Sequence, residues 1–456
     1  MALLAGRSAG ALSRRLGLGG GTVIAGHVVP RLAPQALRSI SSRLPQGVVV
    51  VSGTNGKTTT ARIISRILAE AGLRPLHNRA GANLLTGLVT AIAADATLDG
   101  RPRSDVGVFE VDEATVPRAL EHLVPRALVL TNLFRDQLDR YGEVHYVAGL
   151  WREALARLDP SCQLVLNADD PLVASLSSSR AGGTRYFGIG DRQQAVAALP
   201  HAADARLCTR CQARLDYSLV FYGHLGHYRC PSCGLERPTP AVEAESVVLE
   251  GTEGARLTLR TPAGPIGVSW RLPGLYNVYN ALAATACCLA LGISPEPIRH
   301  GLELFTTAFG RLERITVEER CLYLALVKNP VGFTEVLRTI TGSTPHATLL
   351  ILINDLFADG TDVSWLWDVD AEQLAGRVQL AICSGLRAED MAVRLKYASV
   401  DPSRIVVEND PRRGLELALQ RTVPGDTIYV LPTYTAMLEI RETLRRFGYV
   451  SGFWED

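Results

Sequence analysis

The stretch that decides the fold is Val48-Val-Val-Val-Ser-Gly-Thr-Asn-Gly-Lys-Thr-Thr-Thr60. Its consecutive valines indicate a strand buried on both faces, and the residues after it predict a helix from about Thr58 to Ala71. Between the two, Gly53 and Gly56 let backbone N–H groups turn toward an anion, and the helix N-terminus adds the positive end of its dipole. The stretch therefore predicts a phosphate-binding loop between a buried strand and a helix.

The loop has the chemistry of a nucleotide site. Lys57 supplies a compact charge for the β- and γ-phosphates, and the Thr58 hydroxyl can ligate Mg²⁺. The usual G-x-x-x-x-G-K-[ST] spacing is not met, because Val51 takes the first glycine position. An ordinary strand–turn–helix is the alternative, but only three of the 47 basic residues are lysine, which argues for a specific role of Lys57. We predict that ATP is bound by Gly53, Thr54, Asn55, Gly56, Lys57, Thr58 and Thr59.

The rest of the chain repeats the alternation of apolar strands and helical patterns, which predicts a parallel α/β sheet. Its 456 residues suggest two or three domains, and the alternation restarts after about Arg311. We predict an α/β fold with a central phosphate-loop domain at 46–310, which carries a zinc-ribbon insert at 205–236. A helical lead-in at 1–45 packs on it, and a smaller Rossmann-like domain follows at 311–456. Strands are predicted at Val106–Val111, Ala127–Leu130, Gln163–Asn167, Leu322–Val327, Thr348–Ile353, Leu380–Ser384, Arg404–Val407 and Thr427–Leu431, and further helices at Asn280–Leu291, 332–340 and 371–376.

Charge and hydropathy exclude some classes of function. The net charge of +1 gives no electrostatic case for nucleic acid as a partner. No apolar run reaches the roughly 18–20 residues of a membrane span. Met1–Gly26 carries its arginines inside an apolar segment, which is the wrong order for a signal peptide. We expect a helix and a glycine turn there, with weak association with a membrane surface as the open alternative, and a cytoplasmic protein.

Four cysteines predict a zinc site. Cys208-x₂-Cys211 and Cys230-x₂-Cys233 are separated by 18 residues, a spacing typical of zinc ribbons with a tetrahedral set of four sulfurs. Two disulfides and a redox pair are the alternatives. Because four thiolates leave no open position on zinc, we expect a structural metal rather than a catalytic one.

The loop and several later stretches together resemble the Mur ligase superfamily, which includes the folylpolyglutamate synthases. The resemblance spans roughly residues 45–456 and implies an ATP-dependent ligase. It implies that Glu110 is a catalytic, metal-binding carboxylate, that Asn277 and Asn280 lie on the helix that contacts adenine, and that Arg311 reaches the nucleotide. The stretches that carry it are Phe109-Glu-Val-Asp-Glu113, Thr131-Asn-Leu-Phe-Arg-Asp-Gln-Leu-Asp-Arg-Tyr-Gly142, Asn167-Ala-Asp-Asp170, Gly274-Leu-Tyr-Asn-Val-Tyr-Asn-Ala-Leu-Ala-Ala284 and Phe309-Gly-Arg-Leu-Glu313.

Two departures from that pattern concern the metals. Gln137 stands where the family has a histidine ligand of a second metal ion, and the carbamylated lysine of the family has no counterpart between Lys57 and Lys328. We do not expect Lys328 to reach the site from the later domain. We therefore expect one Mg²⁺, held by Thr58 and Glu110.

The C-terminal third resembles one branch of the superfamily, the Mur-ligase-like subunits of lipid II isoglutaminyl synthases. This resemblance implies ATP-dependent amidation of the α-carboxyl of D-Glu in lipid II or a related peptidoglycan precursor, with ammonia from a GatD-type glutaminase that binds the C-terminal domain. It also implies that one acid of the loop Asp355, Asp359 and Asp362 completes the catalytic group of the glutaminase, with Asp355 as our first choice. The stretches are Lys328-Asn-Pro-Val-Gly-Phe333, Ile353-Asn-Asp-Leu-Phe-Ala-Asp-Gly-Thr-Asp-Val-Ser-Trp-Leu-Trp-Asp368 and Leu431-Pro-Thr-Tyr-Thr-Ala-Met437.

Two other functions stay open at this point. One is a conventional ATP-dependent amino-acid or glutamate ligase of the same fold. The other is a nucleotide-binding scaffold without catalytic activity.

Overall fold

The computed structural model describes residues 29–33, 35–78, 82–136, 144–179, 182–200, 203–306 and 311–450, with the backbone alone at residues 311 and 312. The helix and glycine turn expected in Met1–Gly26 lie outside these residues, as does Gln137. The backbone of Arg311 begins a strand, but its side chain is outside the description, so its contact with a nucleotide stays a prediction.

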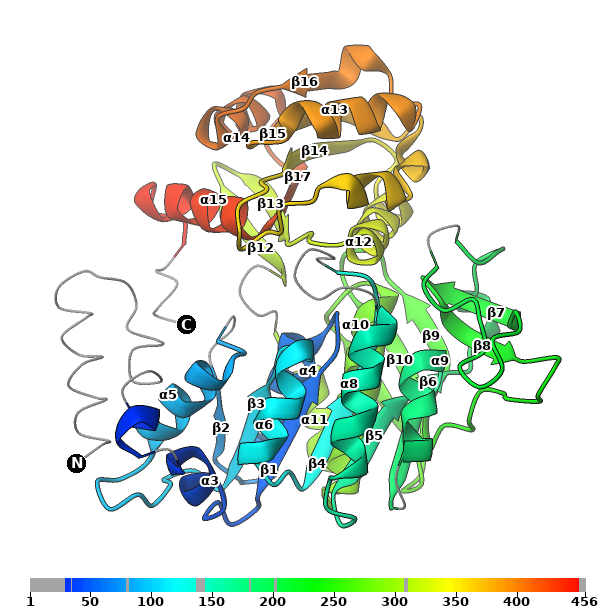
Figure 1. Ribbon diagram of the computed structural model, residues 1–456. Helices are drawn as coiled ribbons and strands as arrows, with labels where there is room; N and C mark the ends of the chain where they lie inside the picture. The colour runs from blue at the N-terminus through cyan, green and yellow to red at the C-terminus, as the bar shows by residue number, and fades with distance from the viewer. Residues whose placement is uncertain are drawn as a thin grey trace.

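The first part of the chain builds a nine-stranded sheet, in the order β11-β10-β9-β6-β5-β4-β1-β3-β2 (Figure 1). The strands from β2 to β9 pair in parallel, and β9, β10 and β11 pair antiparallel at one edge. The parallel α/β sheet predicted from the valine-rich strand is confirmed. The strands are β1 Val48–Ser52, β2 Pro75–His77, β3 Val106–Glu110, β4 Ala127–Leu130, β5 Gln163–Asn167, β6 Thr184–Ile189, β9 Val242–Leu249, β10 Ala255–Arg260 and β11 Ile266–Trp270.

Helices cover both faces of this sheet, and the valines of β1 divide between them. Val49 and Val51 join the core under α4, α10 and α11, whereas Val48 and Val50 join the core under α3, α5, α6 and α8. This division explains why the first four positions of β1 are all apolar rather than alternate ones. The helices are α3 Ala36–Ser41, α4 Lys57–Glu70, α5 Leu85–Asp95, α6 Val116–His122, α8 Val144–Ala156, α9 Pro171–Ala174, α10 Leu275–Ala290 and α11 Pro295–Glu303.

A two-stranded antiparallel hairpin, β7 Asp216–Tyr222 and β8 Leu225–Arg229, lies between the two cysteine pairs. It projects beyond the edge of the main sheet (Figure 1). The break in the α/β pattern that the sequence indicates between about 205 and 240 is this inserted hairpin.

The last third builds a separate six-stranded sheet, in the order β12-β13-β17-β14-β15-β16, parallel except for the hairpin pair β12–β13. Helices α12 and α13 pack on one face, and α14 and α15 pack on the other. The elements are β12 Arg311–Val317, β13 Arg320–Ala325, β14 Ala347–Leu352, β15 Val378–Ser384, β16 Ile405–Val407, β17 Thr427–Pro432, α12 Pro330–Ser343, α13 Ala388–Tyr397, α14 Pro411–Arg421 and α15 Tyr434–Arg446.

The predicted strands of this sheet are confirmed, and its helices differ more from the expectation. The helix predicted at 371–376 is a single 3₁₀ turn, Ala371–Leu374, and α13, α14 and α15 were not predicted. In the first part, α10 begins at Leu275 rather than at Asn280, because Gly274 stands in the left-handed region (φ 84°) and places the first turn earlier. Among the described residues, no helix combines the length and apolar character that would cross a bilayer.

Candidate active site

The phosphate loop joins β1 to α4 and packs too tightly for side chains at its two glycines. Gly53 and Gly56 have φ angles of 139° and 86°. A Cβ on Gly53 would lie 2.1 Å from Thr131 Oγ1, and one on Gly56 would lie 2.0 Å from Asn280 Oδ1. Both positions therefore require glycine, as the sequence predicts.

Residues after β4 hold the loop in shape. Asn55 N donates to Asn132 Oδ1 at 2.8 Å, and Asn55 O accepts from Thr131 Oγ1 at 2.8 Å. Thr54 Oγ1 donates to Phe134 O at 3.1 Å and accepts from Phe134 N at 2.9 Å. The T-N-L-F stretch is therefore the scaffold of the loop.

Lys57 lies under the loop with its ammonium buried. Its Nζ donates to Gly53 O at 2.6 Å, to Thr54 O at 3.2 Å and to Glu113 Oε2 at 3.0 Å. Burial raises the pKa of Glu113, and the charges of Lys57 and Lys328 act in the opposite direction. Trp151 of α8 fixes this acid by donating from Nε1 to its backbone oxygen at 2.9 Å. Glu113 was not predicted as a site residue, although it ends the acid-rich stretch after β3.

Thr58 and Glu110 form the pair that could hold magnesium. Thr58 Oγ1 donates to Glu110 Oε2 at 2.7 Å, and both side chains are buried. Hydroxyl and carboxylate oxygens are ligands that Mg²⁺ prefers. The predicted donors therefore lie together and fit the ion.

A cavity opens beside the loop and extends to the second sheet. Asn55, Gly56, Thr59, Asn277 and Asn280, all predicted to bind nucleotide, line it. Gly53, Thr54, Lys57 and Thr58 belong to the loop without lining the cavity. Its apolar wall comes from both halves of the chain, and the residues are Tyr222, Leu272, Tyr276, Ala325, Leu326, Val331 and Val336.

Lys328 also lines this cavity, so it does reach the first half of the chain, although its absence from a second metal site stays a prediction. It follows β13 in the second half of the chain, and its Nζ donates to Asp136 Oδ2 in the first half at 2.5 Å. The next residue, Asn329, holds Lys328 close to the phosphate loop, because Asn329 Nδ2 donates to Asn55 Oδ1 at 2.9 Å. The other side-chain atom of the amide, Asn329 Oδ1, accepts from Gly332 N and caps α12. This contact between residues far apart in the sequence fixes the start of α12 against the loop.

The N-A-D-D stretch has a structural role. Asp169 Oδ2 accepts from Tyr279 Oη at 2.7 Å, and its Oδ1 accepts from Arg237 Nε at 2.5 Å. Asp170 caps α9 and accepts from Leu133 N at 2.8 Å. The two acids thus tie the scaffold of the loop to α10 and to the residues that follow the insert.

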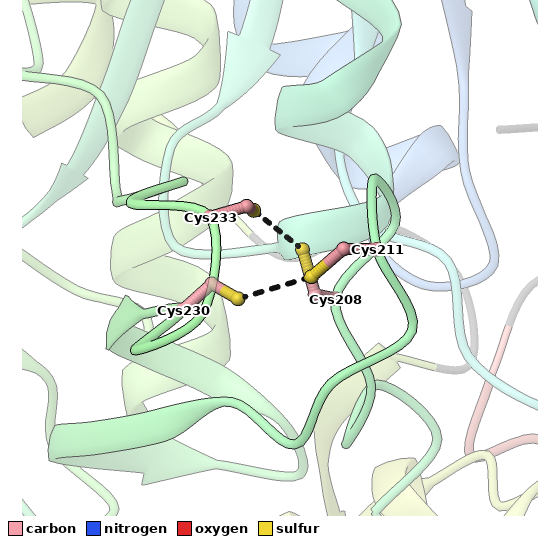
Figure 2. Close-up of side chains that lie close together, drawn as sticks. All are labelled: Cys208, Cys211, Cys230 and Cys233. Atoms are coloured by element: carbon pink, nitrogen blue, oxygen red, sulfur yellow. Dashed lines mark hydrogen bonds between the residues drawn. The ribbon is translucent and has the colours of Figure 1, made fainter.

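The four cysteines converge from two loops (Figure 2). Their sulfur atoms all lie within 4.8 Å of one another, with Cys208–Cys233 at 3.5 Å and Cys211–Cys230 at 3.4 Å. Zn–S bonds of about 2.3 Å place tetrahedral ligands about 3.8 Å apart, so the four thiols fit zinc. Disulfide bonds need about 2.05 Å, and all four cysteines are free thiols.

The hairpin beside this cluster reaches the cavity beside the phosphate loop. Tyr222 lines the cavity, and a Cβ on Gly223 would lie 2.7 Å from Phe134 of the loop scaffold and 3.4 Å from Val331 of α12. His224 is fully buried, and its Nε2 lies 3.3 Å from Asp170 Oδ1. The insert is therefore part of the cavity wall. The sequence does not reveal this contact, because the insert lies far along the chain from the phosphate loop.

Removal of zinc is expected to weaken nucleotide binding. A zinc ion on the four cysteines would hold the two C-x₂-C turns together, so its loss would let them separate and would free the hairpin that carries Tyr222. We expect chelation, or Cys230→Ser with Cys233→Ser, to raise the Kd of ADP at least fivefold. Calorimetric titration with metal analysis would check this, and Cys383→Ser, a buried thiol in β15, is the matched control. An unchanged Kd in metal-free, folded protein would contradict it.

The three acids of the loop after β14 lie in different surroundings. Asp359 is buried and accepts from Thr435 N at 2.8 Å and from its Oγ1 at 2.5 Å. Asp362 accepts from Ser364 N at 2.8 Å in an exposed turn. Asp355 is partly exposed beside Leu356 and Phe357, which are 45% and 80% exposed, and pairs with Arg387 at 3.7 Å. Two of the acids are thus engaged in local hydrogen bonds, and Asp355 borders an exposed apolar surface.

Glu335 of α12 is a buried carboxylate at the cavity, and burial raises its pKa to about 7. Its carboxylate Oε1 lies 3.8 Å from Arg338 Nη1 of the same helix. Because the folded pKa exceeds the unfolded value of 4.5, ionisation costs stability as the pH rises from about 4.5 to about 7.

Glu335→Gln is therefore expected to stabilise the nucleotide-free protein at pH 8 by about 2 kcal/mol, within the limit of about 3 kcal/mol that the shift sets. The gain should shrink as the pH falls toward 4.5. Urea unfolding at both pH values would measure it, and a gain that does not depend on pH would contradict this explanation.

The comparisons with known proteins agree with this geometry. A model of the Mur ligase middle domain matches residues 51–226, and a model of the MurT ligase C-terminal region matches residues 326–437. A pseudomurein peptide ligase type C from Methanothermus fervidus superimposes with a TM-score of 0.68 at 24% identity, over 90% of this chain and 80% of that one. The folylpolyglutamate synthase of Mycobacterium tuberculosis, solved with ADP and AMPPCP, has a TM-score of 0.62 at 16% identity, over 93% and 94% of the two chains.

The fold and the phosphate loop thus define an ATP-dependent ligase of the Mur type. The lipid II isoglutaminyl synthase (glutamine-hydrolyzing) subunit MurT of Streptococcus pneumoniae is 34% identical over 97% of this chain and 96% of its own length. The subunit of the same name from Staphylococcus aureus is 30% identical over 98% and 97%. The chain belongs to the MurT family of lipid II isoglutaminyl synthase subunits.

Proposed function

We propose that this chain uses ATP to amidate the α-carboxyl of D-Glu in the lipid II stem peptide, which yields D-isoglutamine, ADP and phosphate. The observation that carries the proposal is a phosphate loop with a buried lysine in a chain that aligns over nearly its whole length with MurT subunits. The ammonia comes from a GatD-type glutaminase subunit.

The chemistry needs an activated acyl group, because a carboxylate is a poor acyl donor. In the first step a carboxylate oxygen attacks the γ-phosphorus, the bond to the β,γ-bridging oxygen breaks, and ADP leaves. In the second step ammonia attacks the carbonyl carbon, phosphate leaves with the carboxylate oxygen, and the nitrogen loses a proton. Lys57 and the loop N–H groups are placed to stabilise the charge on the phosphate oxygens. Arg311 and the adenine-side residues Asn277 and Asn280 would hold the nucleotide.

The metals have separate places in this proposal. Mg²⁺ bound by Thr58 and Glu110 would neutralise charge on the β- and γ-phosphates. Thr58 and Glu110 already contact each other at 2.7 Å, so the two oxygens need little movement to share an ion. Zinc on Cys208, Cys211, Cys230 and Cys233 would hold the hairpin and take no part in the reaction.

The partner surface is proposed around Asp355. This acid would orient the histidine of the catalytic pair of the glutaminase, while Leu356 and Phe357 supply apolar contact area. Asp359 and Asp362 are less suitable, since each accepts hydrogen bonds from its own chain.

We further propose a division into a lead-in at 1–45, a central ATP-binding domain at 46–310 and a C-terminal domain at 311–456 that binds the glutaminase. The two sheets and their separate cores support it. Because the proposed substrate is lipid-linked, we place the chain in the cytoplasm, near the inner face of the membrane.

An amidation assay tests the proposal. Purified chain, lipid II and MgATP are combined with ammonium chloride or with glutamine plus a GatD-type subunit, and ADP and amidated lipid II are measured. Both nitrogen sources should give one ADP per amide formed. ADP formation with an amino acid but not with ammonium would instead support a conventional amino-acid ligase of the same fold.

A further inference from the structure

Two lysines and two acids from distant parts of the chain meet at the phosphate loop. Lys57 pairs with Glu113 at 3.0 Å, and Lys328 pairs with Asp136 at 2.5 Å. The two pairs are close enough for the charge of Lys328 to lower the pKa of Glu113. Lys328 is thus a second cation beside the loop lysine, and it comes from the other half of the molecule.

The position of Lys328 is fixed relative to the loop. Its neighbour Asn329 is hydrogen-bonded to Asn55 at 2.9 Å, and a Cβ on Gly332 would lie 3.8 Å from Asn55 Oδ1. Lys328 lines the same cavity as Asn55, Gly56 and Thr59. An anion held by the loop would therefore lie within reach of a lysine side chain that begins at this point.

The ion pair between Lys328 and Asp136 contributes little to the stability of the fold. The Oδ1 atom of Asp136 is buried and has no hydrogen-bond partner among the residues that the structure describes. A buried pair with an unsatisfied carboxylate oxygen recovers little of its desolvation cost. Such an arrangement is typical of a site that awaits a ligand.

The presence of lysine rather than arginine at position 328 also indicates a site for a ligand. Arginine fills 44 of the 47 basic positions, whereas Lys57 and Lys328 are two of the three lysines. An ammonium is a compact charge on a flexible stem and can move from one anionic partner to another, whereas a guanidinium is a planar fork that suits a fixed bidentate partner.

We propose that Lys328 is a second phosphate cation: its ammonium moves from Asp136 to the γ-phosphate when ATP fills the cavity. The ammonium then adds to Lys57 in stabilising the charge on the phosphoryl group as it is transferred. This inference rests on the proposed ATP site, and it makes the second half of the chain a direct contributor to the phosphate end of that site.

Nucleotide binding without any acceptor tests it. Calorimetric titration with Mg²⁺ compares ADP with a non-hydrolysable ATP analogue, AMPPCP. In the Lys328→Ala variant we expect the Kd of AMPPCP to rise about tenfold or more, while the Kd of ADP changes less than about threefold. Lys328→Arg should restore part of the preference for the triphosphate.

Asp136→Asn is the matched control, because it breaks the same bridge but keeps the ammonium. It should retain the preference for AMPPCP over ADP. If Lys328→Ala and Asp136→Asn weakened both nucleotides equally, or if Lys328→Ala left both unchanged, the ammonium would serve the bridge alone and the proposal would be wrong. Since the measurement needs neither lipid II nor a glutaminase, its outcome is independent of whether amidation is the reaction.

Discussion

Lys57→Ala is expected to lower the rate of ADP formation at least a thousandfold with either nitrogen source. The ammonium is buried under the loop. In these surroundings of low dielectric, its electrostatic attraction to phosphate oxygens would be stronger than in water. Removing it also leaves the buried carboxyl of Glu113 without the ammonium that it pairs with at 3.0 Å. Initial rates of ADP release at saturating lipid II would measure the loss.

Two further variants make this result specific. Lys396→Ala changes an exposed lysine of α13 and should leave the rate unchanged. Lys57→Ala combined with Glu113→Gln removes both charges, so it should restore nucleotide affinity without restoring turnover. Thermal melting confirms that each variant is folded. A Lys57→Ala protein that is folded and keeps more than a tenth of the activity would rule out the loop as the phosphate site.

Asp355→Asn is expected to separate the two nitrogen sources. Glutamine-dependent amidation should fall at least a hundredfold, because in the proposed complex Asp355 is the acid that orients the histidine of the glutaminase. Ammonium-dependent amidation should stay within about threefold of the original rate, since Asp355 lies in the loop after β14 and does not line the cavity beside the phosphate loop. Amidated lipid II, measured with glutamine plus GatD-type subunit and then with ammonium alone, gives both values.

Asp362→Asn is the control from the same loop and should affect neither rate strongly, since its carboxylate accepts a hydrogen bond within an exposed turn. Equal loss of both rates in Asp355→Asn would mean that the acid acts on folding or on ATP rather than on the partner. Loss of the glutamine-dependent rate in Asp362→Asn alone would move the partner contact to that residue.

The sequence was sufficient for those features that depend on neighbouring residues. Gly53, Gly56 and Lys57 lie within five consecutive residues, and each C-x₂-C pair spans only four. Local sequence patterns therefore predict both the phosphate loop and the cysteine cluster. The valines of β1 predict a central strand because each face of the sheet receives its own helices.

What the sequence did not predict depends on contacts between distant residues. Glu113 pairs with Lys57 across 56 positions, Lys328 reaches Asp136 across 192, and Tyr222 reaches the cavity from an insert. No periodicity or spacing encodes such pairs, because they follow from how the two sheets and the hairpin pack. The scarcity of lysine was the signal that could have identified Lys328, since it already singled out Lys57.

Asn329 has a consequence for how easily the two halves of the molecule separate. One side chain both caps α12 and bonds the phosphate loop, so it acts as a latch between the two halves. A motion that separates the two halves must break the hydrogen bond between Asn329 and Asn55, whereas the cap of α12 moves with its helix because Asn329 and Gly332 lie in the same half. A single hydrogen bond contributes about 1 kcal/mol, so this contact makes a separated arrangement of the two halves about five times rarer than it would be without the Asn329 amide.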